Sequence, residues 1–128
     1  MRATANQYTR WSEAYIRRRA ILWRIRDEYD AAKLEREEIL ESSPPPPDGM
    51  PGGRKITNPV LDKAVRLAML DRFISAVESG LAAVPPEYRK GVWQYVRYGT
   101  RYPYDAARST YERWTRKYLA AVGGRLGG

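Results

Sequence analysis

Apolar side chains recur at intervals of three and four residues over the first third of the chain. This spacing predicts one long amphipathic helix from about Trp11 to Glu41. The segment contains no proline or glycine and is rich in alanine, leucine, arginine and glutamate, which favour helix. We expect residues 1–41 to be an oligomerisation arm that forms a homo-oligomer, namely a dimer. The residues expected at the dimer contact are Trp11, Tyr15, Leu22, Ile25 and Tyr29.

Proline and glycine end this helix and separate it from the rest of the chain. Four prolines, Pro44 to Pro47, favour an extended polyproline II spacer, and a glycine pair follows at Gly52-Gly53. We interpret residues 42–57 as a linker, and a ligand motif for proline-binding domains is the alternative. Residues 58–128 are then expected to form a helical bundle.

The first helix after the linker has the most continuous apolar stripe of the chain. Asn58 can cap this helix, Pro59 fits its first position, and Pro85-Pro86 ends it near Gly80 to Ala83. We expect this helix to be the core of the bundle. Its stripe consists of Val60, Ala64, Leu67, Ile74, Val77 and Leu81.

Two shorter helices are predicted in the last third of the chain. The first runs from Pro86 to about Tyr98 and ends at Gly99. The second begins with a cap at Asp105 or at Ser109, and Gly123-Gly124 ends it. Since no segment alternates as a strand would, the expected fold class is all-α. It consists of a long N-terminal helix and a small helical bundle that ends in a helix-turn-helix-like hairpin, residues 86–122.

The positive charge of the chain is concentrated in the same region. The net charge is +8, and residues 86–128 hold nine Lys/Arg against three Asp/Glu, a net of +6. A localised excess of this size is typical of a protein that binds a polyanion such as nucleic acid. A basic, solvated surface without a partner is the alternative.

The long first helix has a second charge asymmetry. Residues 1–26 hold seven Arg and one Glu, whereas residues 27–41 hold seven acids and two bases. A helix dipole favours the opposite order. Three explanations fit: an antiparallel partner helix, contact of Arg17-Arg18-Arg19 with nucleic acid, or a solvated surface with pairs inside the helix.

The composition also excludes several classes of protein. The chain has no cysteine and no histidine, which removes disulfides, thiolate metal sites and the commonest general base. We therefore expect neither an enzyme nor a protein with a cofactor or metal. No apolar run is long enough to cross a membrane, and the N-terminus lacks a secretory signal, so a cytoplasmic protein without a membrane partner is expected.

A helical wheel divides the last helix into an aromatic face and a basic face. Tyr111, Trp114, Tyr118, Ala121 and Val122 share the face that is expected to pack inward. Three residues near the start of the opposite face are expected to reach base edges, namely Ser109, Thr110 and Arg113. The residues expected to bind phosphates are Arg108, Arg116, Lys117, Arg101, Arg97 and Lys90. An ordinary amphipathic surface helix is the alternative.

A tyrosine cluster precedes this helix, with two interpretations. Tyr98, Tyr102 and Tyr104 lie beside Arg97 and Arg101, an arrangement that suits base stacking on single-stranded nucleic acid. The alternative, which we favour, is that the tyrosine rings close a tight turn over a small core.

Part of the chain resembles a known DNA-binding unit. Val84-Pro-Pro-Glu-Tyr-Arg89, followed by Val92, Tyr95 and Gly99, is similar to the start of the helix-turn-helix in the fourth region of bacterial sigma factors. Ser109-Thr-Tyr-Glu-Arg113 is similar to the start of its recognition helix. About two thirds of the chain resembles phage and prophage late-transcription regulators of the RinA/ArpU type, in a branch marked by Tyr-Arg-Lys-Gly-Val-Trp and Tyr-Pro-Tyr-Asp-Ala.

This resemblance implies a transcriptional regulator of a phage or prophage that binds double-stranded DNA, with RNA polymerase as a further possible partner. One departure is that residues 100–108 leave room for about one helical turn, where sigma-type domains have about two. The alternative function is a helical assembly, packaging or adaptor protein that does not recognise a DNA sequence.

Overall fold

A computed structural model describes the backbone of residues 2–42 and 59–127 and the side chains of residues 13–42 and 61–127. These residues form α-helices and one short 3-10 helix, with no strand in the described ranges, which confirms the all-α expectation. Most of the expected linker, the Asn58 cap and the Trp11 side chain lie outside the described residues. The elements are α1 (Arg2–Glu41), α2 (Pro59–Ser79), η1 (Gly80–Ala83), α3 (Pro86–Tyr98) and α4 (Arg108–Arg125).

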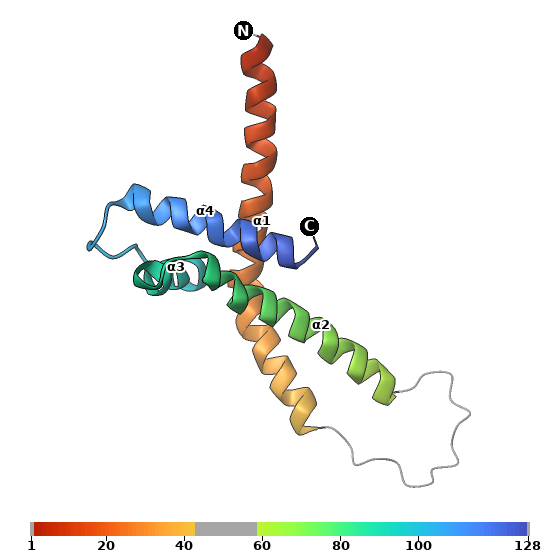
Figure 1. Ribbon diagram of the computed structural model, residues 1–128. Coiled ribbons are helices and arrows are strands. Elements are labelled where there is room, and N and C mark those ends of the chain that lie inside the picture. Colours follow the sequence, from red (N-terminus) through yellow and green to blue (C-terminus); the bar gives the residue numbers. More distant parts are fainter. Residues whose placement is uncertain (1, 43–58, 128) are drawn as a thin grey trace, which may run out of the picture.

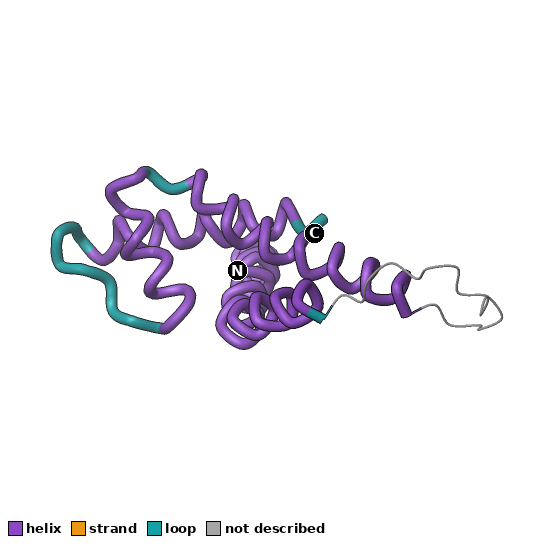
Figure 2. The backbone as a smooth tube through the Cα atoms, turned by 90° about the horizontal axis from the view of Figure 1, so that it is seen from below, coloured by secondary structure: helices purple, strands orange, loops and turns teal. Residues whose placement is uncertain are grey.

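Helix α1 is the axis around which the other helices are arranged (Figure 1). It begins at Arg2 rather than near Trp11, because the residues before Trp11 include no proline or glycine to stop a helix. Helix α4 crosses α1 near its middle, and the N-terminal part of α1 extends beyond this crossing (Figure 1). Figure 2, which looks from below, shows α1 nearly end-on and the other helices around it.

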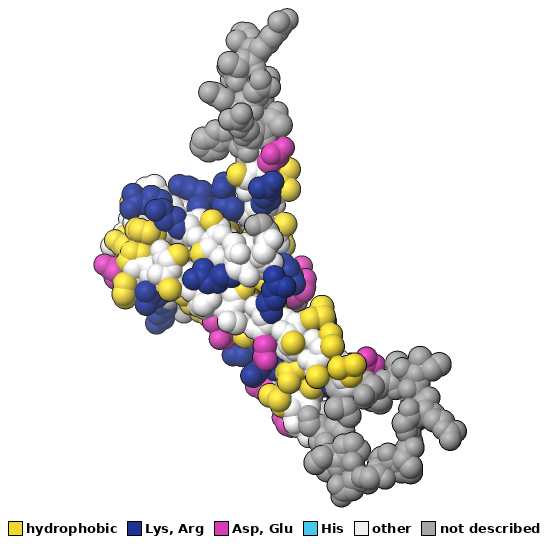
Figure 3. All heavy atoms as spheres, turned by 45° about the vertical axis from the view of Figure 1, so that its right-hand side comes forward, with side chains coloured by type: hydrophobic (Ala, Val, Ile, Leu, Met, Phe, Trp, Pro, Cys, Tyr) yellow, Lys and Arg dark blue, Asp and Glu magenta, His cyan; other side chains and the backbone are white. Residues whose placement is uncertain are grey.

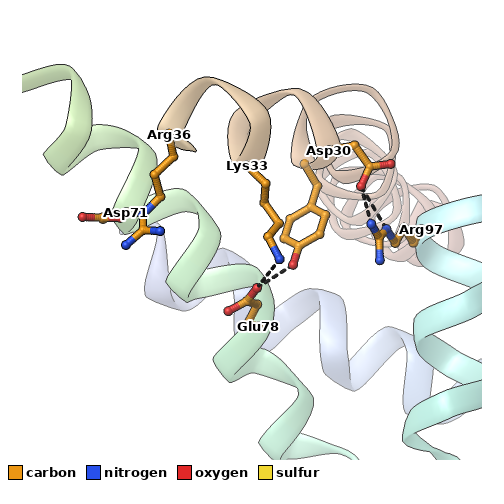
Figure 4. A network of polar contacts seen from close by, with 7 residues as sticks. Asp30, Lys33, Arg36, Asp71, Glu78 and Arg97 are labelled. Atoms are coloured by element: carbon orange, nitrogen blue, oxygen red, sulfur yellow. Dashed lines mark hydrogen bonds and ion pairs between the residues drawn. The ribbon is translucent and has the colours of Figure 1, made fainter. Parts of the chain in front are cut away.

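The C-terminal half of α1 runs antiparallel to α2 (Figure 1). The hydroxyl of Tyr29 on α1 donates a hydrogen bond of 2.5 Å to the carboxylate of Glu78 on α2 (Figure 4). Three ion pairs also join the two helices: Lys33 with Glu78, Arg36 with Asp71, and Glu35 with Arg66. The acidic half of α1 is therefore partnered by α2 of the same chain.

The core lies where all four α-helices meet. Leu22, Ile25 and Tyr29 of α1 are 5%, 1% and 3% exposed, and they pack with Val77 of α2 and Val96 of α3 in one apolar cluster. The expectation that these three residues of α1 form a dimer contact is wrong, since their side chains are already buried within the chain. Burial of an apolar side chain of this size contributes about 1.5–3 kcal/mol.

Helix α3 has the predicted limits and is fastened to α1 at its C-terminal end. Gly99 ends the helix in a left-handed conformation, with φ of 73°. The guanidinium of Arg26 on α1 donates hydrogen bonds to the carbonyls of Tyr95 and Val96, at 2.8 and 3.0 Å. The carbonyl of Tyr95 also accepts a hydrogen bond of 2.8 Å from the amide of Gly99, whereas the carbonyl of Val96 lies in the last turn, where helix carbonyls lack an amide partner. The long helix thus satisfies the end of α3 and fixes its position.

Candidate nucleic-acid interface

Helix α4 begins without a side-chain cap. The backbone carbonyl of Ala107 accepts hydrogen bonds from the amides of Thr110 and Tyr111, at 3.0 and 3.3 Å. The expected caps at Asp105 and Ser109 are both wrong. Asp105 is used differently, because its carboxylate accepts a hydrogen bond of 2.6 Å from the hydroxyl of Tyr111.

The buried face of α4 is largely the one that the wheel predicts. Tyr111, Tyr118 and Val122 are almost completely buried, while Trp114 and Ala121 are half-buried. The hydroxyl of Tyr118 donates to the carbonyl of Val77 in α2, at 2.7 Å. Burial raises the pKa of Tyr118 above its ordinary value, because the ionised form would lose its hydration. Two further residues pack inward that the wheel did not assign, namely Thr115 and Leu119. Helix α4 also continues through Gly123-Gly124, the pair expected to end it.

The opposite face of α4 is exposed and basic. Ser109, Arg113, Arg116 and Lys117 are exposed, and Thr110 is half-buried. In Figure 3, Lys and Arg side chains gather over this region of the molecule. We call Arg113, Arg116 and Lys117 the α4 basic face.

One acid lies near this face, and it is paired within the helix. The carboxylate of Glu112 lies 3.4 Å from the guanidinium of Arg108, one helical turn away. Because Glu112 pairs with Arg108, no carboxylate of α4 neutralises Arg113, Arg116 or Lys117. Arg108, one of the predicted phosphate contacts, therefore has its charge partly compensated by Glu112.

An aromatic ring orients two of these cations. The guanidinium of Arg113 and the ammonium of Lys117 lie 5.0 and 5.4 Å from the centre of the Trp114 ring. Tyr88 of α3 stacks on the same ring, with centroids 6.4 Å apart. Cation–π contacts at such distances restrict the cations without neutralising them. The sequence reasoning assigned Trp114 only to packing, although the cations at Arg113 and Lys117, one and three residues away, were the signal for this second role.

The other predicted phosphate contacts lie on other elements. Arg97 of α3 forms an ion pair of 2.6 Å with Asp30 of α1, and its side chain is 27% exposed (Figure 4). This pair raises the pKa of Arg97, against the effect of burial, which lowers it. Arg97 thus ties α3 to α1. Lys90 of α3 and Arg101 of the loop before α4 are exposed.

The loop between α3 and α4 is shaped by stacked tyrosines. The ring of Tyr102 stacks between those of Tyr95 and Tyr111, at centroid distances of 4.4 and 5.2 Å. Its hydroxyl is 2.8 Å from that of Thr115. Tyr102 therefore closes the small core, as favoured above, whereas Tyr98 and Tyr104 are exposed.

Residues 99–107 contain no helix, although residues 100–108 leave room for about one helical turn. Helices α3 and α4 form a hairpin joined by an ordered loop. A helix-turn-helix joins its two helices by three or four residues. The hairpin therefore presents the α4 basic face without the scaffold helix of the sigma-type unit.

Comparison of this chain with protein-family models, curated proteins and solved structures finds no match. Among the described helices, none is both long and apolar enough to cross a membrane. The same residues contain no group of three or more acids that could hold a metal ion.

Proposed function

We propose that this protein binds double-stranded DNA through the α4 basic face and regulates transcription from a phage or prophage genome. The DNA-binding part of this proposal is supported by the difference between the two faces of α4. One face is fixed in the core, while the other offers Arg113, Arg116 and Lys117 with no acid left unpaired in the helix. Neutralising phosphates with such cations releases counterions and favours binding. The regulatory part rests on the resemblance of the sequence to late-transcription regulators.

The absence of a scaffold helix bears on how α4 meets DNA. In a helix-turn-helix the recognition helix enters the major groove with its N-terminal residues at the base edges. Here Ser109 and Thr110 stand at that end, and they remain the candidates for base contacts together with Arg113. Arg116 and Lys117 follow one turn later and are the candidates for phosphate contacts.

An anisotropy titration of labelled duplex DNA at several salt concentrations tests this proposal. Arg116→Ala is expected to weaken binding and to lower the salt dependence by about one phosphate contact. Arg125→Ala is the matched control. It removes a cation from the same helix, but the Arg125 side chain donates to the carbonyl of Ala121 and lies outside the basic face. Equal effects of the two variants, or binding that is insensitive to salt, would contradict the proposal.

A second candidate function is helical assembly or adaptor activity. It is favoured by apolar side chains on the outer face of α2, where Val65 and Met69 are 52% and 58% exposed (Figure 3). Exposed apolar residues grouped on one helix are typical of protein contact sites. Light scattering of the wild-type protein and of Val65→Lys/Met69→Lys tests it. A defined oligomer that the double variant dissociates would favour this function.

A further inference from the structure

The place where α4 crosses α1 forms a corner between the two helices (Figure 1). A Cβ atom added to Gly123 of α4 would lie 2.8 Å from the Cδ1 atom of Ile21, so the two helices touch there. Before Ile21, helix α1 leaves the bundle, and residues 13–17 are exposed on every side of the helix. The corner is therefore bounded by α4 and by an uncovered length of α1.

The register of α1 directs two arginines toward this corner. Arg17 and Arg18 stand one helical turn before Ile21 and Leu22, the residues that face α4 and the core. Arg18 is half-buried, whereas Arg17 is exposed. Arg19 takes a different direction, because its guanidinium lies between the rings of Tyr15 and Trp23, at 5.7 and 5.8 Å. The three consecutive arginines are thus divided between two sides of α1.

We infer that Arg17 and Arg18 form a second DNA contact, which holds the same duplex as the α4 basic face. The inference rests on the proposed DNA-binding function and extends it to the first helix. Lys117 lies six residues before Gly123, which is about 9 Å along α4. Arg17 lies about 6 Å along α1 from Ile21. Arg17, Arg116 and Lys117 are therefore within about 11 Å of the corner along their helices, comparable with the major groove width of about 12 Å, whereas Arg113 lies about 15 Å from it.

The charges around the corner favour a polyanion. Glu13 is the single acid in residues 13–26 of α1, whereas the acidic half of the helix is engaged with α2 and α3. The uncovered residues of α4 between its cations are small, as at Ala120 and Gly124. Tyr15 and Ile16 are exposed on the same length of α1, so the excess of arginine over acid is what favours a duplex over a protein partner.

The test compares glutamine variants that remove charge without adding an acid. The slope of log Kobs against log salt is measured by anisotropy with one labelled duplex, for Arg17→Gln/Arg18→Gln, for Arg19→Gln and for Arg116→Gln/Lys117→Gln. The first and third variants are each expected to lower the slope by about 1.8, the value for two phosphate contacts. Arg19→Gln is the matched control, with the wild-type slope. Circular dichroism verifies that the helix content of each variant is unchanged.

Three results would overturn the inference. A wild-type slope for Arg17→Gln/Arg18→Gln contradicts it, and a lowered slope for Arg116→Gln/Lys117→Gln in that case leaves the proposed function standing. A loss of about 0.9 for Arg19→Gln, half that of the double variant, shows that any charge on α1 has the same effect. A titration that ends at two duplexes per protein shows that the two sites bind separate duplexes. If no variant changes the slope, the proposed function fails as well.

Discussion

Gly91 offers a sharp test of how the α3–α4 hairpin is held. This residue lies in the middle of α3, where an alanine normally stabilises a helix by about 1 kcal/mol relative to glycine. A Cβ atom at this position would lie 2.6 Å from a ring carbon of Tyr111 and 2.8 Å from the Cδ of Pro103. Tyr111 is fixed, since it is 1% exposed and stacks on Tyr102, whereas Pro103 is an exposed residue of the loop. The Gly91→Ala variant must therefore displace the tyrosine stack.

The change in the free energy of unfolding of Gly91→Ala is the sum of two opposing contributions. Overpacking of a well-packed core costs about 1–3 kcal/mol, and helix propensity returns up to about 1 kcal/mol. Gly124→Ala provides the second contribution alone, because a Cβ atom there has no neighbour within 4 Å among the described residues. The difference between the two variants then approximates the packing cost. For a chain of this size it corresponds to a difference of about 4 °C in melting temperature for each kcal/mol.

Urea denaturation monitored by circular dichroism measures both variants. Gly124→Ala is expected to be as stable as the wild type or more stable, and Gly91→Ala to be less stable than Gly124→Ala by about 1–3 kcal/mol. If the two variants have the same free energy of unfolding, the close contact of α3 with Tyr111 and Pro103 has no energetic weight. The packing of α3 against the tyrosine stack would then not hold the loop in place.

Two further predictions concern the ends of the hairpin. Arg26→Met keeps the stem but loses the hydrogen bonds to the carbonyls of Tyr95 and Val96, and it is expected to lower the free energy of unfolding in urea by about 1.5–3 kcal/mol. Burial raises the pKa of Tyr102 and of Tyr111 from 10.0 to about 12, so the neutral rings are favoured in the fold. The resulting stability is present below pH 10 and is lost as the pH rises to about 12. The urea midpoint should fall over that interval together with the rise of tyrosinate absorbance, and a midpoint independent of pH there would contradict this prediction.

The limits of α3 were predictable because its end signals are local, unlike those of α4. Pro85-Pro86 and Gly99 restrict the backbone wherever they occur, and the limits of α3 follow from them alone. The start of α1 was not predictable from its apolar seam, since the helix continues to Arg2 beyond the seam. A seam marks which residues pack, whereas a helix continues until a residue stops it.

The partner of that seam could not be read from the sequence. The stripe through Leu22, Ile25 and Tyr29 was assigned to a second copy of the chain, but these residues pack on α2, α3 and α4. An apolar stripe has the same spacing whether its partner is the same chain or another one. The pair of Arg97 with Asp30 escaped prediction for the same reason, because the two residues are far apart in sequence and are joined only by the fold.

One feature of the candidate site was also predictable from the sequence, and another was not. The partition of α4 into packed and exposed sides follows from 3.6 residues per turn, and it placed Arg113, Arg116 and Lys117 on the exposed side. The shape of the connection before α4 depends instead on Tyr102, whose ring stacks between rings from both helices. Such a stack leaves no periodic signal in the sequence.

The order of charges along α1 now has a tertiary explanation. A helix dipole alone would favour acids at the start and bases at the end, and α1 has the reverse. Its acidic half is held by Arg66 of α2 and Arg97 of α3, with which Glu35 and Asp30 form ion pairs. Its basic half extends past the crossing with α4, where no described helix covers it. The acidic half thus bears the charge that suits the arginines of α2 and α3. The basic half bears the charge that suits duplex DNA, the partner that the Arg17→Gln/Arg18→Gln variant tests.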